Sequence, residues 1–166
     1  IGRIALRMRG GAENGALVLL QHLQPIADIG GMFLAGLGAD GKIGAVGFCM
    51  SGPLVMGLAQ RMPEKVAAIA SVHGAWVVTD KEDSPHLDID QIQAEVYFAW
   101  ADDDPTATAE EREIMDAAMA DAGINYRIDF MAGALHGFAP PGGERYDKDA
   151  AERHWERVHA LFQRNL

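Results

Sequence analysis

The sequence contains a single cysteine among its 166 residues, and this shortage excludes two classes of protein. Both a disulfide-stapled domain and a multi-cysteine metal site need several cysteines. For Cys49 two roles remain open, a buried structural thiol or one reactive thiol. No two histidines have metal-ligand spacing with a third ligand nearby, so we expect no metal site.

Basic residues are also scarce, with 14 Lys and Arg against 24 Asp and Glu and a formal net charge of −10. Such a surplus repels phosphate backbones and anionic bilayers, and no basic patch offsets it. No apolar run approaches the roughly 18 residues of a membrane span, and the opening IGRIALRMRGG lacks the apolar core of a signal peptide. We therefore expect a cytoplasmic protein that binds neither nucleic acid nor membrane.

Four short segments have the length and composition of strands, at residues 42–48, 66–72, 95–101 and 125–131. The first three are almost continuously apolar, as in parallel strands covered on both faces, whereas the fourth alternates as an edge strand does. Since 49% of the residues are hydrophobic and no repeat or long linker divides the chain, residues 1–166 are predicted to form one domain.

Helix-length segments alternate with these strands. One helix is predicted from Pro25 to about residue 37, ending before the Asp40-Gly41 turn, and a second between Cys49 and Pro63. A capping box at residues 108–111 opens a third, which stops near residue 123, and an amphipathic pattern at residues 151–162 predicts a fourth. The alternation predicts a three-layer α/β fold, with a mostly parallel sheet and helices on both faces.

Cys49 lies in Gly47-Phe48-Cys49-Met50-Ser51-Gly52, where a predicted strand turns sharply into a helix. This is the pattern of a nucleophile elbow, in which small neighbours allow a tight bend and the helix start favours a thiolate. The amide of Met50 would be one donor to an oxyanion. Ser51 stands where G-x-S-x-G has its second glycine, and a buried structural cysteine remains the alternative.

An acidic run, Asp102-Asp103-Asp104, follows the third predicted strand, and His136 follows the fourth. A carboxylate there could accept the Nδ1 proton of a histidine, although an acidic run is usually a solvated turn. The order nucleophile, acid, histidine is the chain order of α/β-hydrolases, so we predict a triad of Cys49, a carboxylate of this acidic run and His136.

For the other histidines and for two aromatic residues, the sequence gives weaker evidence of a functional role. His73 directly follows a predicted strand and could line the pocket or be a structural histidine; Trp76 and Phe138 are further candidates for substrate contact. His86 is expected to pin its loop. His22, His154 and His159 lie in helical patterns, where solvent-facing or capping roles are expected.

Several separated motifs resemble the dienelactone hydrolase family, a branch of the α/β-hydrolases with a cysteine nucleophile. They are IGAVGFCMSG around Cys49, SVHG at 71–74, DSPHL at 83–87, EVYFAWADDDP at 95–105, GALHGFAPP at 133–141 and YDKDAAERHWERVHALF at 146–162. The resemblance covers residues 24–166 and leaves residues 1–23 as an atypical segment. It implies hydrolysis of a small ester or lactone without a cofactor. It carries the nucleophile to Cys49, the base to His136 and the acid to Asp104, with Asp103 as the near alternative.

The family pattern also includes several strands before residue 25, where this chain has only about two dozen residues. The resemblance therefore implies an α/β-hydrolase fold without those strands, one of which normally supplies the second oxyanion amide. In addition, Pro140 stands where well-known members have a carboxylate-binding arginine. A non-catalytic or redox-sensing relative that serves as a binding or assembly module is the alternative function.

Without those strands, residues 42–48 are expected to form an exposed apolar sheet edge. Three segments could cover it: residues 4–8, residues 16–20, or the same edge of a second copy in a homodimer.

Overall fold

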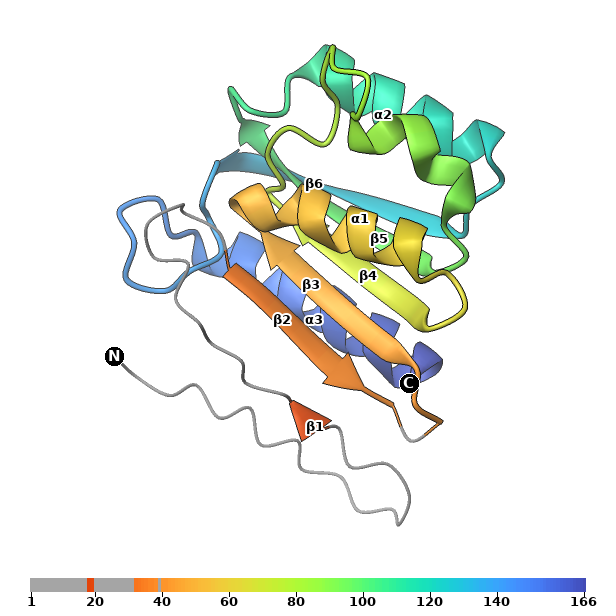
Figure 1. Cartoon of the computed structure of the whole chain (residues 1–166). Helices are drawn as coiled ribbons and strands as arrows, with labels where there is room; N and C mark the ends of the chain where they lie inside the picture. Colours follow the sequence, from red (N-terminus) through yellow and green to blue (C-terminus); the bar gives the residue numbers. More distant parts are fainter. Residues whose placement is uncertain (1–17, 20–31, 39) are drawn as a thin grey trace.

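A sheet between two helical layers forms the centre of the molecule, in a computed structural model that describes residues 18–19, 32–38 and 40–166 (Figure 1). Its strands lie side by side in chain order: β1 (Val18–Leu19), β2 (Met32–Leu37), β3 (Ile43–Phe48), β4 (Val66–Val72), β5 (Glu95–Asp103) and β6 (Tyr126–Leu135). The strands β3 to β6 are parallel, and β2 runs antiparallel to β3. The predicted α/β class is confirmed.

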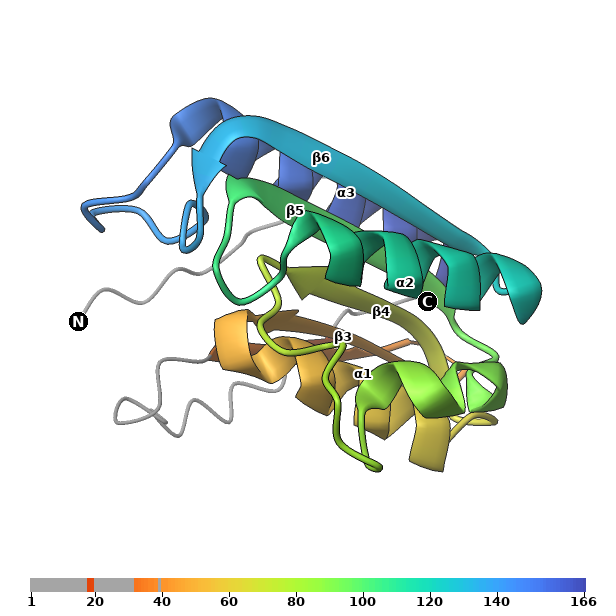
Figure 2. The ribbon, with the colours of Figure 1, turned by 90° about the horizontal axis from the view of Figure 1, so that it is seen from above.

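Helices cover both faces of the sheet. Figure 2 shows α1 (Gly52–Arg61) and α2 (Ala109–Asp121) on one face and α3 (Lys148–Asn165) on the other. On the first face, the buried side chains of Met56, Met115 and Trp100 belong to one apolar core. On the second, Val46 and Leu161 belong to a separate core beneath α3. Two cores on opposite faces explain why the central strands are apolar almost without interruption.

The four predicted strands and the last three predicted helices are present. The predicted capping box is confirmed, since the Thr108 hydroxyl accepts from the Glu111 amide and the Glu111 carboxylate accepts from the Thr108 amide. Gly123, at φ +68°, ends the turn after α2 as expected. The strand β6 lies at the edge of the sheet, but it extends to Leu135, four residues beyond the predicted end.

The helix predicted for residues 25–37 is wrong where the structure describes it. Residues 32–37 form β2, which pairs along its whole length with β3, from Met32 opposite Phe48 to Leu37 opposite Ile43. A six-residue apolar run fits a buried strand as well as a helix, so periodicity alone could not decide. The turn supplies the missing signal: Gly41 has φ +80°, and the Lys42 amide donates to Asp40 Oδ1 at 2.9 Å. Asp-Gly between two apolar runs is typical of a hairpin.

The hairpin also corrects the predicted sheet edge. Because β2 covers β3, residues 42–48 are not an exposed edge, and the reason for pairing a second copy there disappears. Of residues 16–20, only Val18–Leu19 is described, and it pairs with β2 rather than β3. Residues 4–8 lie outside the described part of the chain. Among the helices that the structure describes, none has the length and apolarity to cross a membrane.

Candidate active site

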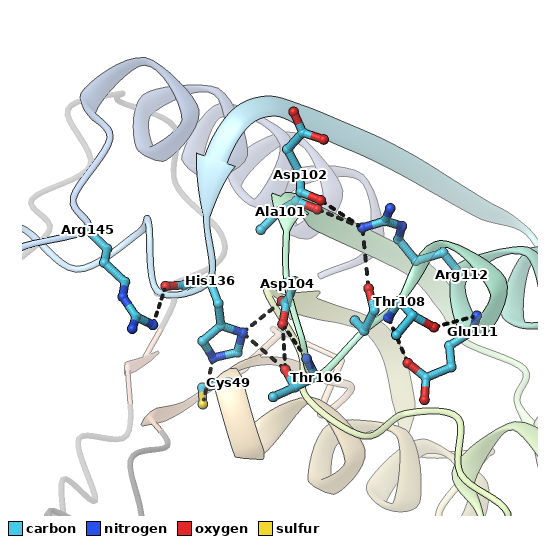
Figure 3. Close-up of polar contacts among 11 residues, drawn as sticks. Cys49, Ala101, Asp102, Asp104, Thr106, Thr108, Glu111, Arg112, His136 and Arg145 are labelled. Atoms are coloured by element: carbon cyan, nitrogen blue, oxygen red, sulfur yellow. Dashed lines mark hydrogen bonds and ion pairs between the residues drawn. The ribbon is translucent and has the colours of Figure 1, made fainter.

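Four polar side chains follow the ends of four neighbouring parallel strands. Cys49 comes directly after β3, His73 after β4, Asp104 after β5 and His136 after β6. The carboxyl ends of parallel strands meet at the same edge of a sheet, which is where ligands bind in open α/β folds. Figure 3 shows three of these residues, Cys49, Asp104 and His136, converging at that edge.

The turn that carries Cys49 is tight. Cys49 itself has φ +54°, and a short 3₁₀ turn, Cys49–Ser51, leads directly into α1. A Cβ atom added to Gly47 would overlap the backbone carbonyl oxygen of Ser51, so only glycine fits there. Ser51 is buried. This is the strained strand-to-helix bend predicted from the sequence.

Two polar contacts connect the three side chains in a row. His136 Nε2 lies 3.1 Å from Cys49 Sγ, and His136 Nδ1 lies 2.7 Å from Asp104 Oδ2 (Figure 3). The Thr106 hydroxyl donates to Asp104 Oδ1 at 2.6 Å, and the Thr106 amide donates to the same oxygen at 2.9 Å. The carboxylate is therefore held from one side by Thr106 and faces His136 with its other oxygen.

The same contacts shift the pKa values of Cys49, His136 and Asp104 in the directions that favour their charged forms. The hydrogen bond from His136 lowers the pKa of the half-buried Cys49 thiol, and its effect exceeds that of burial, which raises the pKa; the Met50 backbone amide lowers it further. The hydrogen bonds to Asp104 and then to Cys49 raise the pKa of His136 to about 9. Burial raises the pKa of Asp104, but hydrogen bonds from His136 and Thr106 outweigh burial and lower it overall. These directions favour a thiolate, an imidazolium and a carboxylate near neutral pH.

The structure distinguishes among the three adjacent aspartates. Asp104 is 5% exposed and contacts His136 through its side chain. Asp103 is exposed, and its contact with His136 is a backbone one, from the His136 amide to the Asp103 carbonyl at 3.3 Å. The Asp102 carboxylate accepts from the Gly133 amide at 2.8 Å, which ties β5 to β6. Of the two predicted acids, Asp104 is therefore the one whose carboxylate is in reach of the histidine.

The three residues predicted to contact substrate differ in their exposure. Trp76 is 48% exposed and lines a groove. His73 is 2% exposed and lies beside the site, with its ring centroid 5.1 Å from that of His136. Phe138 is fully buried, and its ring centroid lies 5.2 Å from that of His73. Its contact with substrate stays a prediction.

Burial also decides the charge of two histidines. It lowers the pKa of His73 to about 4 and that of His154 to about 3, so both rings are neutral near neutral pH. The expected solvent-facing or capping role of His154 is wrong, because it lies three residues after Ala151 and four before Val158, on the buried face of α3. His86 does pin its loop, since Nδ1 lies 2.7 Å from the Ser84 hydroxyl. His22 lies outside the described residues.

One residue of the site was missed by sequence reasoning. Thr106 holds the carboxylate of Asp104 and also lies 3.2 Å from His136 Nδ1 through its hydroxyl. The spacing of Asp104 and Thr106 in the sequence could have indicated this role, since a hydroxyl two residues after an aspartate can close a turn onto the carboxylate. As to metal binding, no cluster of three or more His, Cys, Asp or Glu side chains suited to an ion occurs in the described part of the chain.

Comparison with known proteins gives a consistent result over most of the chain. The model of the dienelactone hydrolase family matches residues 33–166. A Synechocystis sp. protein named "Putative carboxymethylenebutenolidase" is 30% identical over 128 residues, which cover 75% of this chain and 51% of that protein. A Saccharolobus solfataricus protein of the same name is 31% identical over 127 residues, which cover 74% of this chain and 44% of that protein.

The solved structures agree in fold. A crystal structure of a "Putative Dienelactone Hydrolase" from Klebsiella pneumoniae subsp. pneumoniae superposes with a TM-score of 0.64 at 24% identity, covering 71% of this chain and 50% of that one. The chain thus spans about half the length of these relatives.

Proposed function

From the premise that this chain belongs to the dienelactone hydrolase family, we propose that it hydrolyses an ester or lactone through a thioester on Cys49. One observation carries the proposal: Cys49 Sγ, the His136 ring and the Asp104 carboxylate form a continuous row of contacts of 3.1 and 2.7 Å. A nucleophile in contact with a base that is itself oriented by a third group is the arrangement required for covalent catalysis.

The first half of the proposed reaction forms the thioester. The Cys49 thiolate attacks the carbonyl carbon, and the negative charge moves to the carbonyl oxygen of a tetrahedral intermediate. When the carbonyl reforms, the bond between carbon and the alcohol oxygen breaks, and the His136 imidazolium gives the departing oxygen its proton. The Asp104 carboxylate holds Nδ1 and stabilises the imidazolium that precedes this step.

The second half releases the acid and restores the enzyme. The neutral His136 takes a proton from water, which attacks the thioester carbon; the carbon–sulfur bond then breaks and returns Cys49 as a thiolate. From an ester, the products are a carboxylic acid and an alcohol. From a lactone, one ring-opened hydroxy acid leaves, because acyl and alcohol parts are joined.

The oxyanion needs donors that are in position before the reaction starts. The Met50 amide already contributes to stabilising the Cys49 thiolate, which supports it as one donor. In the family pattern the second donor comes from a segment before residue 25, and of those residues the structure describes only Val18–Leu19.

The alternative is a thiol that reacts without turnover, as in a redox-sensing relative. The lowered pKa of a half-exposed Cys49 supports this alternative too, because a thiolate is readily oxidised. Deacylation separates the two functions, since only the hydrolase regenerates its thiol after each substrate.

Hydrolysis of p-nitrophenyl acetate by the wild type and by Cys49→Ala tests the proposal. We expect many equivalents of p-nitrophenolate per wild-type chain, and a rate for Cys49→Ala at least about 10³-fold lower in kcat. An undiminished rate in Cys49→Ala would refute the thioester route. Release of one equivalent and no more, with a stable acyl adduct on Cys49 by mass spectrometry, would instead support the reactive thiol without turnover.

A further inference from the structure

The proposed mechanism gives no role to a groove whose lining includes Trp76 and none of Cys49, Asp104 and His136. Its lining comes from the loop that follows β4 and from the first half of α2, and its volume of about 820 Å³ is in the range of small-molecule sites. We call it the Trp76 groove; its lining residues are Trp76, Val78, Thr79, Asp80, Lys81, Glu110, Glu111 and Ile114.

Trp76 connects this groove to the catalytic groups. Its backbone amide donates to the carbonyl oxygen of Thr106 at 3.0 Å, and Thr106 holds Asp104. The neighbouring amide, that of Ala75, donates to the carbonyl oxygen of Cys49 at 3.0 Å. The backbone of residues 75–76 is therefore fixed between the nucleophile turn and the acid loop, and the Trp76 side chain lines the groove.

The conformation of Trp76 has no explanation in core packing. Its φ of +54° is in the left-handed region, which disfavours every residue with a side chain, and 48% of its surface is exposed. A large apolar side chain gains little in stability from such a position. Ile114, 40% exposed, belongs to the same groove, and Val78 adds a buried apolar wall. Contact with an apolar ligand would account for both exposed side chains.

The charged residues of the groove determine whether it accepts an acidic or a neutral ligand. The lining residues include three carboxylates, those of Asp80, Glu110 and Glu111, and one ammonium group, that of Lys81. The Glu111 carboxylate is retained in the capping box, where it accepts from the Thr108 amide at 2.7 Å. A surplus of carboxylates repels an acidic ligand and tolerates a neutral one.

We propose that the Trp76 groove binds the apolar, uncharged part of the substrate and that it selects against a carboxylate there. The inference rests on the proposed function for its biological meaning, because the groove would hold the ester or lactone whose carbonyl reaches Cys49. The substrate class is thus a neutral ester or lactone with an aromatic or alkyl substituent, and Trp76 is a residue that sets specificity.

The test uses thiol alkylation, which needs no turnover. The rates of Cys49 modification by N-ethylmaleimide, N-phenylmaleimide and the anionic 4-maleimidobutyric acid are measured for the wild type, Trp76→Ala, Trp76→Phe and Leu87→Ala. Leu87 is the matched control, since it is 54% exposed and lies outside the groove lining. Free cysteine gives the intrinsic rate ratios.

We expect the wild type to prefer the phenyl over the ethyl reagent, relative to free cysteine, by about three- to tenfold, the value of one aromatic contact. Trp76→Ala should lose this preference, Trp76→Phe should keep most of it, and Leu87→Ala should keep all of it. The anionic reagent should react more slowly than with free cysteine, and Glu110→Gln should reduce that difference. Equal preferences in the wild type and Trp76→Ala, or an equal loss in Leu87→Ala, would overturn the proposal. If these preferences hold but esters are not turned over, the proposed function fails and the groove assignment stands.

Discussion

Replacement of Asp104 with asparagine should lower kcat for ester hydrolysis by up to about 10⁴-fold while the protein stays folded. Asparagine keeps an oxygen that can accept from the Thr106 amide and hydroxyl, so the local turn is retained. It loses the negative charge 2.7 Å from His136 Nδ1 that raises the pKa of the histidine and fixes its tautomer. Steady-state kinetics with p-nitrophenyl acetate measures the effect, and the urea unfolding midpoint checks the fold.

Asp103→Asn is the matched control for this variant. The Asp103 side chain is exposed, and its contact with His136 is through the backbone carbonyl, which the substitution leaves in place. We expect kcat within a few-fold of the wild type. A loss in Asp103→Asn as large as that in Asp104→Asn, or no loss in Asp104→Asn, would show that Asp104 is not the acid of the site.

Replacement of Gly47 with alanine should destabilise the fold by about 3 kcal/mol or more. The new methyl group would overlap the backbone carbonyl oxygen of Ser51, and neither β3 nor the turn can move without disturbing its neighbours. The nucleophile turn would open, so activity should fall together with stability. Urea denaturation, followed by circular dichroism, gives the free energy of unfolding.

Gly57→Ala makes the same chemical change, but we expect it to raise the stability of the fold rather than lower it. Gly57 lies within α1, and an added Cβ would have only ordinary contact, 3.7 Å from the tip of Arg61. Alanine is preferred over glycine in a helix by about 1 kcal/mol, so this variant should be more stable than the wild type. If Gly47→Ala were as stable as Gly57→Ala, the tight approach of Gly47 to Ser51 would not exist in solution.

Most of the fold followed from local sequence patterns. The strands β3, β4 and β5 were predictable because parallel strands buried on both faces are nearly all apolar, and α2 because Thr108 and Glu111 have capping-box spacing. The apolar run at residues 32–37 could not by itself distinguish a strand from a helix, and the Asp40-Gly41 turn after it was taken as the end of a helix rather than as a hairpin turn. Pairing with β3 decides the matter, and pairing is a property of the folded sheet rather than of the segment.

The candidate site was predictable in chain order but not in detail. Cys49, Asp104 and His136 each follow a recognisable strand, so their positions in the sequence are enough to indicate them as a group. Thr106 was missed because its role depends on a turn that brings its hydroxyl back to the carboxylate. Sequence proximity to His136 likewise could not reveal that the Phe138 side chain is fully buried.

The proposed mechanism depends on the pairing of Cys49 with His136, and the pH dependence of Cys49 alkylation by iodoacetamide tests this pairing most directly. Since only the thiolate reacts, the inflection of the rate reports the thiol pKa. We predict an inflection below the ordinary value of about 8.5 in the wild type. We also predict a rise above the wild-type value in His136→Ala, because burial then raises the pKa without the opposing hydrogen bond from His136. An ordinary or raised pKa in the wild type, unchanged in His136→Ala, would contradict the ion pair and identify Cys49 as a structural thiol.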